Sequence, residues 1–122
     1  EILQNLNINK LLSKRKENLN YLYNNLDNEV IKPLFRKTKV KSPFFMSILF
    51  RNEKVRELYR KKLIEFKIYP PIHWGLPTDV SYIFRYEHEL SKNILSIPID
   101  QRYGLKDMMY ITNILNFRYI EW

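Results

Sequence analysis

The sequence predicts one small α/β domain of two layers (α+β), in which helices pack on one face of a mainly antiparallel sheet. Apolar residues recur every three or four positions in the longer segments, which is typical of amphipathic helices. Short apolar runs of strand length lie between these segments, and some end at proline. The 122 residues correspond to a single domain (1–122), and an apolar content of 45% is sufficient for a core without metal or disulfides.

The chain is expected to begin with a long helix. Leucines keep helical spacing from Leu3 to Leu26, but the asparagines of the first turns are poor helix formers. Either those turns fray or the helix begins nearer Lys10. Pro33 then ends the connection, and the basic residues 36–41 are expected in a loop or an exposed strand.

The middle of the chain is predicted to hold a strand, a helix and a second strand. Residues 42–50 place apolar side chains on both faces of an extended segment, which indicates a strand covered on both sides. Asn52 is a suitable N-cap for an amphipathic helix over residues 53–66. A short strand over residues 67–72 is expected at a sheet edge, because its two prolines cannot donate ladder hydrogen bonds.

A helix, a strand and a helix complete the predicted order. Residues 80–92 are expected to be mostly helical, with Phe84 and Leu90 turned inward. Residues 94–97 form a short apolar strand that Pro98 ends. After a turn at residues 102–104, helical spacing is kept by Leu105, Met108, Ile111, Leu115 and Arg118 or Tyr119.

The composition limits the classes of function. Lys and Arg total 21 against 13 acidic residues, and the resulting charge of +8 favours phosphate-bearing partners such as nucleic acid. The basic residues are spread over three segments, however, which favours the solvated faces of a basic protein. There is no cysteine, so disulfides and thiolate metal sites are excluded. No apolar run approaches the roughly 20 residues of a membrane helix, and we expect a soluble, cytoplasmic protein.

Several catalytic motifs are missing from the sequence. Gly75 and Gly104 are the only glycines, so neither a Walker-type loop nor a dinucleotide-binding glycine fingerprint can form. His73 and His88 are the only histidines, and neither lies in the zinc-binding H-E-x-x-H pattern. No G-x-S-x-G nucleophile elbow occurs. We therefore assign no catalytic, cofactor-binding or metal-binding residue.

Two segments concentrate residues that line clefts in other proteins. The first is IYPPIHWGLP at Ile68–Pro77, where the prolines fix the backbone and His73 and Trp74 offer a titratable donor and a flat apolar ring. The second is LSIPIDQRYGLKDM at Leu95–Met108, in which Arg102 can form paired hydrogen bonds with a carboxylate or a phosphate.

A purely structural role for the same residues stays open at this point. Trp74 could fill the core, and His73 could bond a backbone carbonyl. Arg102 could pair with Asp100 or with Asp107. The chemistry of the side chains alone does not decide between these roles and a binding site.

Three longer stretches, taken together, resemble a known family. They are RKENLNYL at Arg15–Leu22, VRELYRKKLIEFKIYPPIHW at Val55–Trp74 and ELSKNILSIPIDQRY at Glu89–Tyr103, followed by the D-x-x-x-I pattern of Asp107–Ile111. Their order and spacing resemble the C-terminal small domain of the DegT/DnrJ/StrS-type sugar aminotransferases. The resemblance covers almost the entire chain, although each motif alone has low specificity.

This resemblance implies a fold-type-I enzyme dependent on pyridoxal phosphate. Such a transferase moves an amino group onto a keto group of a nucleotide-linked sugar, and its products enter bacterial surface polysaccharides. In that family the Schiff-base lysine and the phosphate-binding residues belong to a large N-terminal domain, which this sequence lacks. The chain alone is then expected to be inactive and to bind no cofactor, with the large domain and a second copy of the protein as its partners. A dehydratase relative that uses the same cofactor would look alike here.

By the same resemblance, His73 and Trp74 lie at the edge of the cleft between the two domains and close over the sugar substrate. Arg102 and Tyr103 are expected to contact the large domain or its ligand. An isolated small domain should also expose an apolar patch, including Trp74, where the large domain docks. The alternative hypothesis is a freestanding basic module that reuses this small domain after loss of the catalytic half, and that binds nucleic acid or another anionic partner or serves assembly. Nucleic acid is the less favoured partner.

Overall fold

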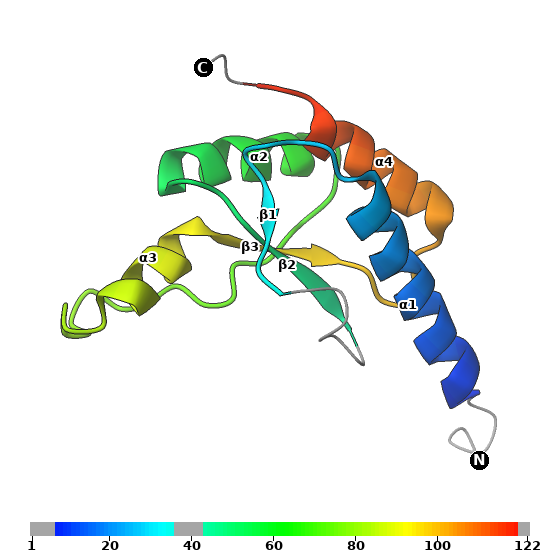
Figure 1. The fold of residues 1–122 in the computed structure, drawn as a ribbon, viewed down its shortest axis with the longest axis horizontal. Coiled ribbons are helices and arrows are strands. Elements are labelled where there is room, and N and C mark those ends of the chain that lie inside the picture. Colours follow the sequence, from blue (N-terminus) through cyan, green and yellow to red (C-terminus); the bar gives the residue numbers. More distant parts are fainter. Residues whose placement is uncertain (1–6, 36–42, 120–122) are drawn as a thin grey trace.

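The computed structural model describes residues 7–35 and 43–119. These residues form four helices and a three-stranded antiparallel sheet with the strand order β1-β2-β3 (Figure 1). The predicted α+β class with a small antiparallel sheet is therefore confirmed. In chain order the elements are α1 (Ile8–Asn25), β1 (Lys32–Pro33), β2 (Phe45–Leu49), α2 (Glu53–Glu65), α3 (Arg85–Asn93), β3 (Ile94–Pro98) and α4 (Leu105–Asn116).

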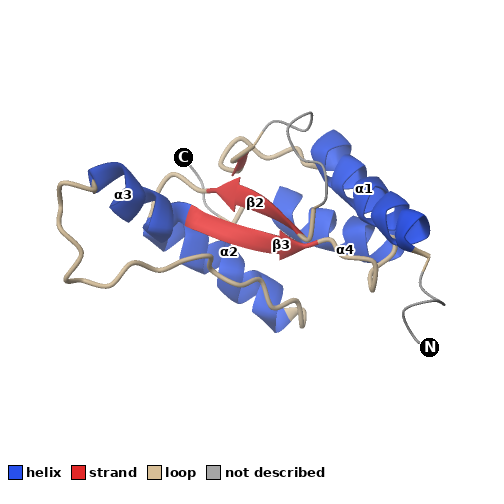
Figure 2. Ribbon diagram, turned by 90° about the horizontal axis from the view of Figure 1, so that it is seen from below, coloured by secondary structure: helices blue, strands red, loops and turns tan. Residues whose placement is uncertain are grey.

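The two faces of the sheet have different cover. In Figure 2 the strands lie in front of α2 and α4, which pack on the far face, whereas none of the described helices lies on the near face. The far face carries the centre of the core, since Met46, Ile48, Leu95 and Ile97 are at most 2% exposed. Helix α1 packs beside α4, and α3 extends from one end of the sheet.

The starts of the first two helices follow from local hydrogen bonds. The side chain of Asn7 accepts a hydrogen bond from the backbone N–H of Lys10 at 3.1 Å and caps α1. The helix therefore begins at Ile8, close to Lys10, which agrees with the second of the two alternatives. Asn52 caps α2 as predicted, because its side chain accepts from the N–H of Val55 at 2.9 Å.

The prediction of a strand over residues 67–72 is wrong. This segment runs along the free edge of β3, where the carbonyl of Pro71 accepts a hydrogen bond from the N–H of Ser96 at 3.0 Å. Neither Pro70 nor Pro71 has an N–H to return such a bond, so no ladder develops. The third strand is instead β1, which pairs with β2 through Lys32 and Pro33 at the opposite edge.

Two further expectations needed correction. Helix α3 begins only at Arg85, because the preceding residues from Val80 form turns, and its buried residue is His88. Both residues were expected to turn inward, but Phe84 is exposed and Leu90 is only half-buried, so neither is part of the core. Strand β2 is fully buried on one face and only half-buried on the other, since no described helix covers that side. The basic stretch 36–41 lies outside the described residues.

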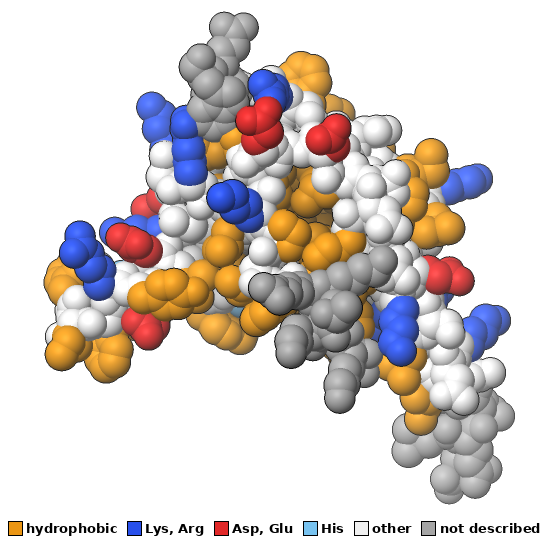
Figure 3. Space-filling model, viewed as in Figure 1, with side chains coloured by type: hydrophobic (Ala, Val, Ile, Leu, Met, Phe, Trp, Pro, Cys, Tyr) orange, Lys and Arg blue, Asp and Glu red, His pale blue; other side chains and the backbone are white. Residues whose placement is uncertain are grey.

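The surface is basic without a single basic patch on the face shown in Figure 3. Lysine and arginine side chains are scattered there over several elements, with acidic side chains among them. Hydrophobic side chains gather at the end of the molecule formed by α3 and the loop before it. That loop exposes Trp74, Tyr82 and Ile83, each by at least three quarters of its surface.

Candidate functional site

The first predicted pair of residues lies against the sheet face that no described helix covers. We call this the helix-free face, and its residues are Phe45, Ser47 and Leu49 of β2 and Ile94, Ser96 and Pro98 of β3. The Nδ1 atom of His73 lies 2.9 Å from the Oγ atom of Ser96, within hydrogen-bond distance. The His73 ring also meets the ring of Phe45 edge to face, with centroids 5.0 Å apart. His73 is thus fixed on the helix-free face by one polar and one aromatic contact.

Trp74 stands next to His73 and projects into solvent. Its indole is 76% exposed, and its centroid is 4.7 Å from that of the His73 ring. Trp74 therefore does not fill the core, and the hydrogen bond of His73 goes to a serine side chain rather than to a backbone carbonyl. Neither structural role considered from the sequence applies to these two residues.

Arg102 pairs with Asp100, one of the two structural partners that the sequence left open. Its Nε and one terminal nitrogen donate to the two carboxylate oxygens of Asp100 at 2.8 and 2.9 Å, and its backbone N–H adds a third bond at 3.0 Å. These bonds lower the pKa of the Asp100 carboxyl, which is only 2% exposed. The other alternative, Asp107, instead accepts from the N–H of Gly104 at 2.8 Å and caps α4.

The loop that carries Arg102 and Tyr103 is anchored to α1 by residues that sequence reasoning missed. The side-chain amide of Asn18 donates to the carbonyls of Ile99 and Tyr103, each at 3.0 Å, and also approaches that of Asp100 at 3.3 Å. Asn18 is buried, so its amide holds this loop in place from the inside. One signal was available in the sequence, because Asn18 is a polar residue on the leucine-bearing side of the helix.

A groove of about 400 Å³ opens beside the helix-free face. We call it the α2–α4 groove. The second predicted pair, Arg102 and Tyr103, lines it together with Phe45, the same phenylalanine that meets His73. Phe45 therefore links the two predicted pairs, since it contacts His73 and lines the groove with Arg102 and Tyr103. None of the groove's other lining residues was predicted as a site residue: Phe66, Lys67, Ile68, Tyr69, Pro71, Pro98, Asp107, Tyr110 and Ile111.

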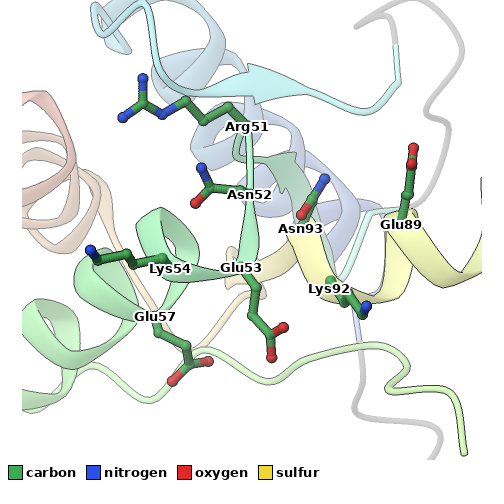
Figure 4. A pocket seen from close by; sticks show the side chains of 8 residues that line it. All are labelled: Arg51, Asn52, Glu53, Lys54, Glu57, Glu89, Lys92 and Asn93. Atoms are coloured by element: carbon green, nitrogen blue, oxygen red, sulfur yellow. The ribbon is translucent and has the colours of Figure 1, made fainter. Parts of the chain in front are cut away.

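A second, larger hollow lies where α2 and α3 meet (Figure 4). In Figure 4 the side chains of Glu53 and Glu57 extend to the same side, whereas Arg51 points away toward β1. Buried Arg56 is 3.6 and 3.2 Å from these two carboxylates and donates to the carbonyl of Ser91 at 2.8 Å. Arg56 thus joins α2 to α3, and the two glutamates beside it balance its charge, which is a structural role.

The start of α4 is not free to bind a phosphate group, and the described residues hold no cluster of metal ligands. Phosphate is commonly held by free N–H groups at a helix N-terminus, but at α4 the Asp107 carboxylate takes the N–H of Gly104. Among residues 7–35 and 43–119 no group of three or more acidic or histidine side chains could hold a metal ion. None of the helices in these ranges combines the length and apolarity needed to cross a bilayer.

Comparison with known proteins finds similarity in structure but not in sequence. No family model and no curated protein matches the chain. A solved structure named "Putative sugar aminotransferase Spr1654 from Streptococcus pneumoniae, PLP-form" matches 88% of this chain with a TM-score of 0.72 and 18% identity. The aminotransferase TlmJ from Streptoalloteichus hindustanus matches 89% with a TM-score of 0.67 and 12% identity.

The chain covers only part of these proteins. It spans 31% of the Streptococcus pneumoniae protein and 32% of TlmJ. At these identities the likeness establishes a shared fold. The chain therefore shares the fold of about a third of each of these two proteins.

Proposed function

We propose that this chain is the C-terminal small domain of a pyridoxal-phosphate-dependent aminotransferase of the DegT/DnrJ/StrS type. The observation that carries the proposal is the shared fold, which extends over 88% of this chain but less than a third of a protein solved in its PLP form. The family motifs noted in the sequence also extend over almost the entire chain. The substrate would be a keto sugar linked to a nucleotide, in the synthesis of bacterial surface polysaccharide in the cytoplasm.

In this proposal the cofactor is held by the large domain of the parent protein. When bound there, pyridoxal phosphate supplies the electron sink for amino transfer. Without that domain, the chain alone would be inactive. Its contribution would be to complete the substrate cleft and the homodimer that the large domain builds.

The helix-free face would then lie toward the large domain. His73, held by Ser96 and Phe45, and exposed Trp74 would form the wall of the cleft that closes over the sugar. Arg102 and Tyr103 would contact the large domain or its ligand. Phe45 and Leu49 of β2 are half-buried on this face, whereas its β3 residues are already buried, so the β2 side and exposed Trp74 suit a surface that another domain covers.

A freestanding basic binding module is the second candidate, and the charge of +8 favours it. On the face shown in Figure 3 the lysine and arginine side chains are scattered, whereas nucleic acid is bound by basic residues gathered on one face. A module derived from the small domain would share the fold as well, so the cofactor band of the full reading frame is what separates the two candidates.

The test uses the complete reading frame that contains this chain. The purified protein is expected to show the absorbance band of lysine-bound pyridoxal phosphate, and sodium borohydride should abolish it. In that protein His73→Ala should slow amino transfer while the band stays, whereas Tyr86→Ala on exposed α3 should leave both unchanged. A colourless protein that takes up no added cofactor would contradict the proposal.

A further inference from the structure

We propose that Ser96 is a positioning residue, which holds the ring of His73 in the tautomer that carries its proton on Nε2. In that tautomer Nε2 donates a hydrogen bond to an oxygen atom of a bound ligand. The tautomer is a property of this chain by itself. Only the identity of the ligand, a substrate held in the cleft, rests on the proposed function.

Ser96 is a buried polar residue in an otherwise apolar strand. Every residue of β3 is buried, and Ser96 itself is 1% exposed. A hydroxyl in such a place has a free-energy cost unless it forms a hydrogen bond. Within residues 7–35 and 43–119 its oxygen has one hydrogen-bond partner, the Nδ1 atom of His73 at 2.9 Å. The contact with His73 therefore explains how a serine is tolerated at this position.

The direction of this hydrogen bond follows from the needs of the hydroxyl. The Nδ1 atom of a neutral imidazole either donates or accepts, whereas the hydroxyl has one hydrogen that needs an acceptor. If Nδ1 donated, the hydrogen of the Ser96 hydroxyl would be buried without an acceptor among the described residues. The geometry therefore favours donation from Ser96 to Nδ1. Because a neutral imidazole has a single N–H, the proton is then on Nε2.

Two further contacts fix the place and the plane of the ring. The backbone N–H of Ser96 donates to the carbonyl of Pro71 at 3.0 Å, so the same residue anchors the chain two positions before His73. Phe45 of the neighbouring strand meets the His73 ring edge to face, with centroids 5.0 Å apart. Ser96 thus binds this segment through its backbone and its side chain, and the imidazole needs little reorganisation before it binds a ligand.

The Nε2 atom of His73 is open to a ligand. It has no hydrogen-bond partner among the described residues, and it is not one of their buried polar atoms that lack a partner. The residue is half-buried, with exposed Trp74 beside it. An N–H that is held in place and reaches solvent is a suitable donor to a hydroxyl or carbonyl oxygen.

His88, the second histidine of the chain, provides an internal reference. Its Nε2 atom lies 2.9 Å from the carbonyl oxygen of Val80, which only accepts, so neutral His88 carries its proton on Nε2. Unlike His73, it uses this N–H inside the fold, where it is 8% exposed. The two histidines should therefore show the same tautomer for different reasons.

The test is nitrogen NMR of the two imidazole rings in the 122-residue chain, at a pH of about 8, where neutral histidine generally prevails. Couplings between the ring nitrogens and the carbon-bound ring hydrogens identify the nitrogen that carries the proton. We expect the Nε2–H pattern for both rings. A His73 ring with its proton on Nδ1 would overturn the proposal, and this result needs no variant.

Three serine variants separate positioning from structure. Ser96→Ala should move the Nδ1 resonance of His73 and leave that of His88 in place, because only the former loses its donor. Ser96→Thr keeps the hydroxyl and should keep the wild-type signals. Ser91→Ala, which removes a serine hydroxyl bond inside α3, is the matched control and should leave His73 unchanged. If Ser96→Ala leaves the His73 signals as in the wild type, Ser96 does not position the ring.

The consequence for the proposed function is measured in the full reading frame. Ser96→Ala should lower kcat/KM for amino transfer by roughly three- to tenfold with the cofactor band intact, and Ser96→Thr should restore most of it. Equal losses for the two variants would assign Ser96 a packing role and overturn the positioning role. A protein without the cofactor band refutes the aminotransferase but not the tautomer. A protein with the band but with His73 protonated on Nδ1 refutes only the tautomer.

Discussion

The same two strands serve different purposes on their two faces. Toward α2 and α4, the side chains of Ile48, Leu95 and Ile97 are completely buried and form the core. On the helix-free face, Leu49 and Phe45 are only half-buried, and two serines face one another across the strands. The comparison teaches that one face is complete without any partner, whereas the other carries the polar and aromatic contacts that position a candidate site.

The largest expected effect separates two neighbouring residues of β2. Ile48→Ala should lower the free energy of unfolding by about 2 to 5 kcal/mol, because it leaves a cavity in a fully buried layer. Leu49→Ala, one residue later on the helix-free face, should cost about 1 kcal/mol or less, since that side chain already meets solvent. Urea unfolding of the isolated chain measures both. Equal losses would mean that the helix-free face is packed as a second core.

The next effect concerns the anchor of the Arg102 loop. Asn18→Ala should cost about 1 to 3 kcal/mol, because buried carbonyls of the loop lose their donor. Asn20→Ala on the exposed side of the same helix is the matched control and should be nearly neutral. If urea unfolding gives similar values for the two variants, the loop is held by other contacts.

A smaller, pH-dependent effect is expected for Arg102. In the wild type, hydrogen bonds from Arg102 depress the pKa of Asp100, so the pair stabilises the fold above the ordinary aspartate pKa and this stabilisation is lost as the pH falls through the depressed value. Arg102→Ala should therefore lower the melting temperature by several degrees at neutral pH. The difference from wild type should shrink in acid. A difference that is independent of pH would contradict this origin, and Arg85→Ala on exposed α3 serves as the control.

The smallest effect on folding is expected at Trp74, whose ring is the most exposed among the described residues. Trp74→Ala should change the free energy of unfolding of the isolated chain by less than about 0.5 kcal/mol, because the indole contacts little besides His73. In the full protein the same change should raise the KM for the sugar substrate. A large loss of stability in the isolated chain would place Trp74 in the fold rather than in the cleft.

Much of the architecture followed from periodicity and capping in the sequence. The leucine spacing of α1, the Asn52 cap of α2 and the apolar run of β3 were each sufficient to place an element. The failures have local causes. Residues 67–72 have strand composition, but their prolines remove the donors that a ladder needs, and β1 is too short to leave a pattern.

The candidate site was only partly predictable. The chemistry of His73, Trp74 and Arg102 marked them as candidates, and in the structure Phe45 contacts His73 and lines a groove with Arg102. Lys67 was not found, because nothing in a sequence marks a lysine that adopts a left-handed backbone. Nor could the sequence assign Asn18 to the carbonyls of a loop more than 80 residues away.

The most direct test of the central claim is whether the helix-free face is covered in the complete protein. This chain has no cysteine, so Ser47→Cys on that face and Lys61→Cys on the outer side of α2 are single reporters within it. Thiol labelling is measured by mass spectrometry of the peptides that contain them, in the isolated chain and in the full reading frame. We expect Cys labelling at position 47 to slow markedly in the full protein while labelling at position 61 stays the same. Equal rates at position 47 in both proteins would contradict a large domain that docks on this face.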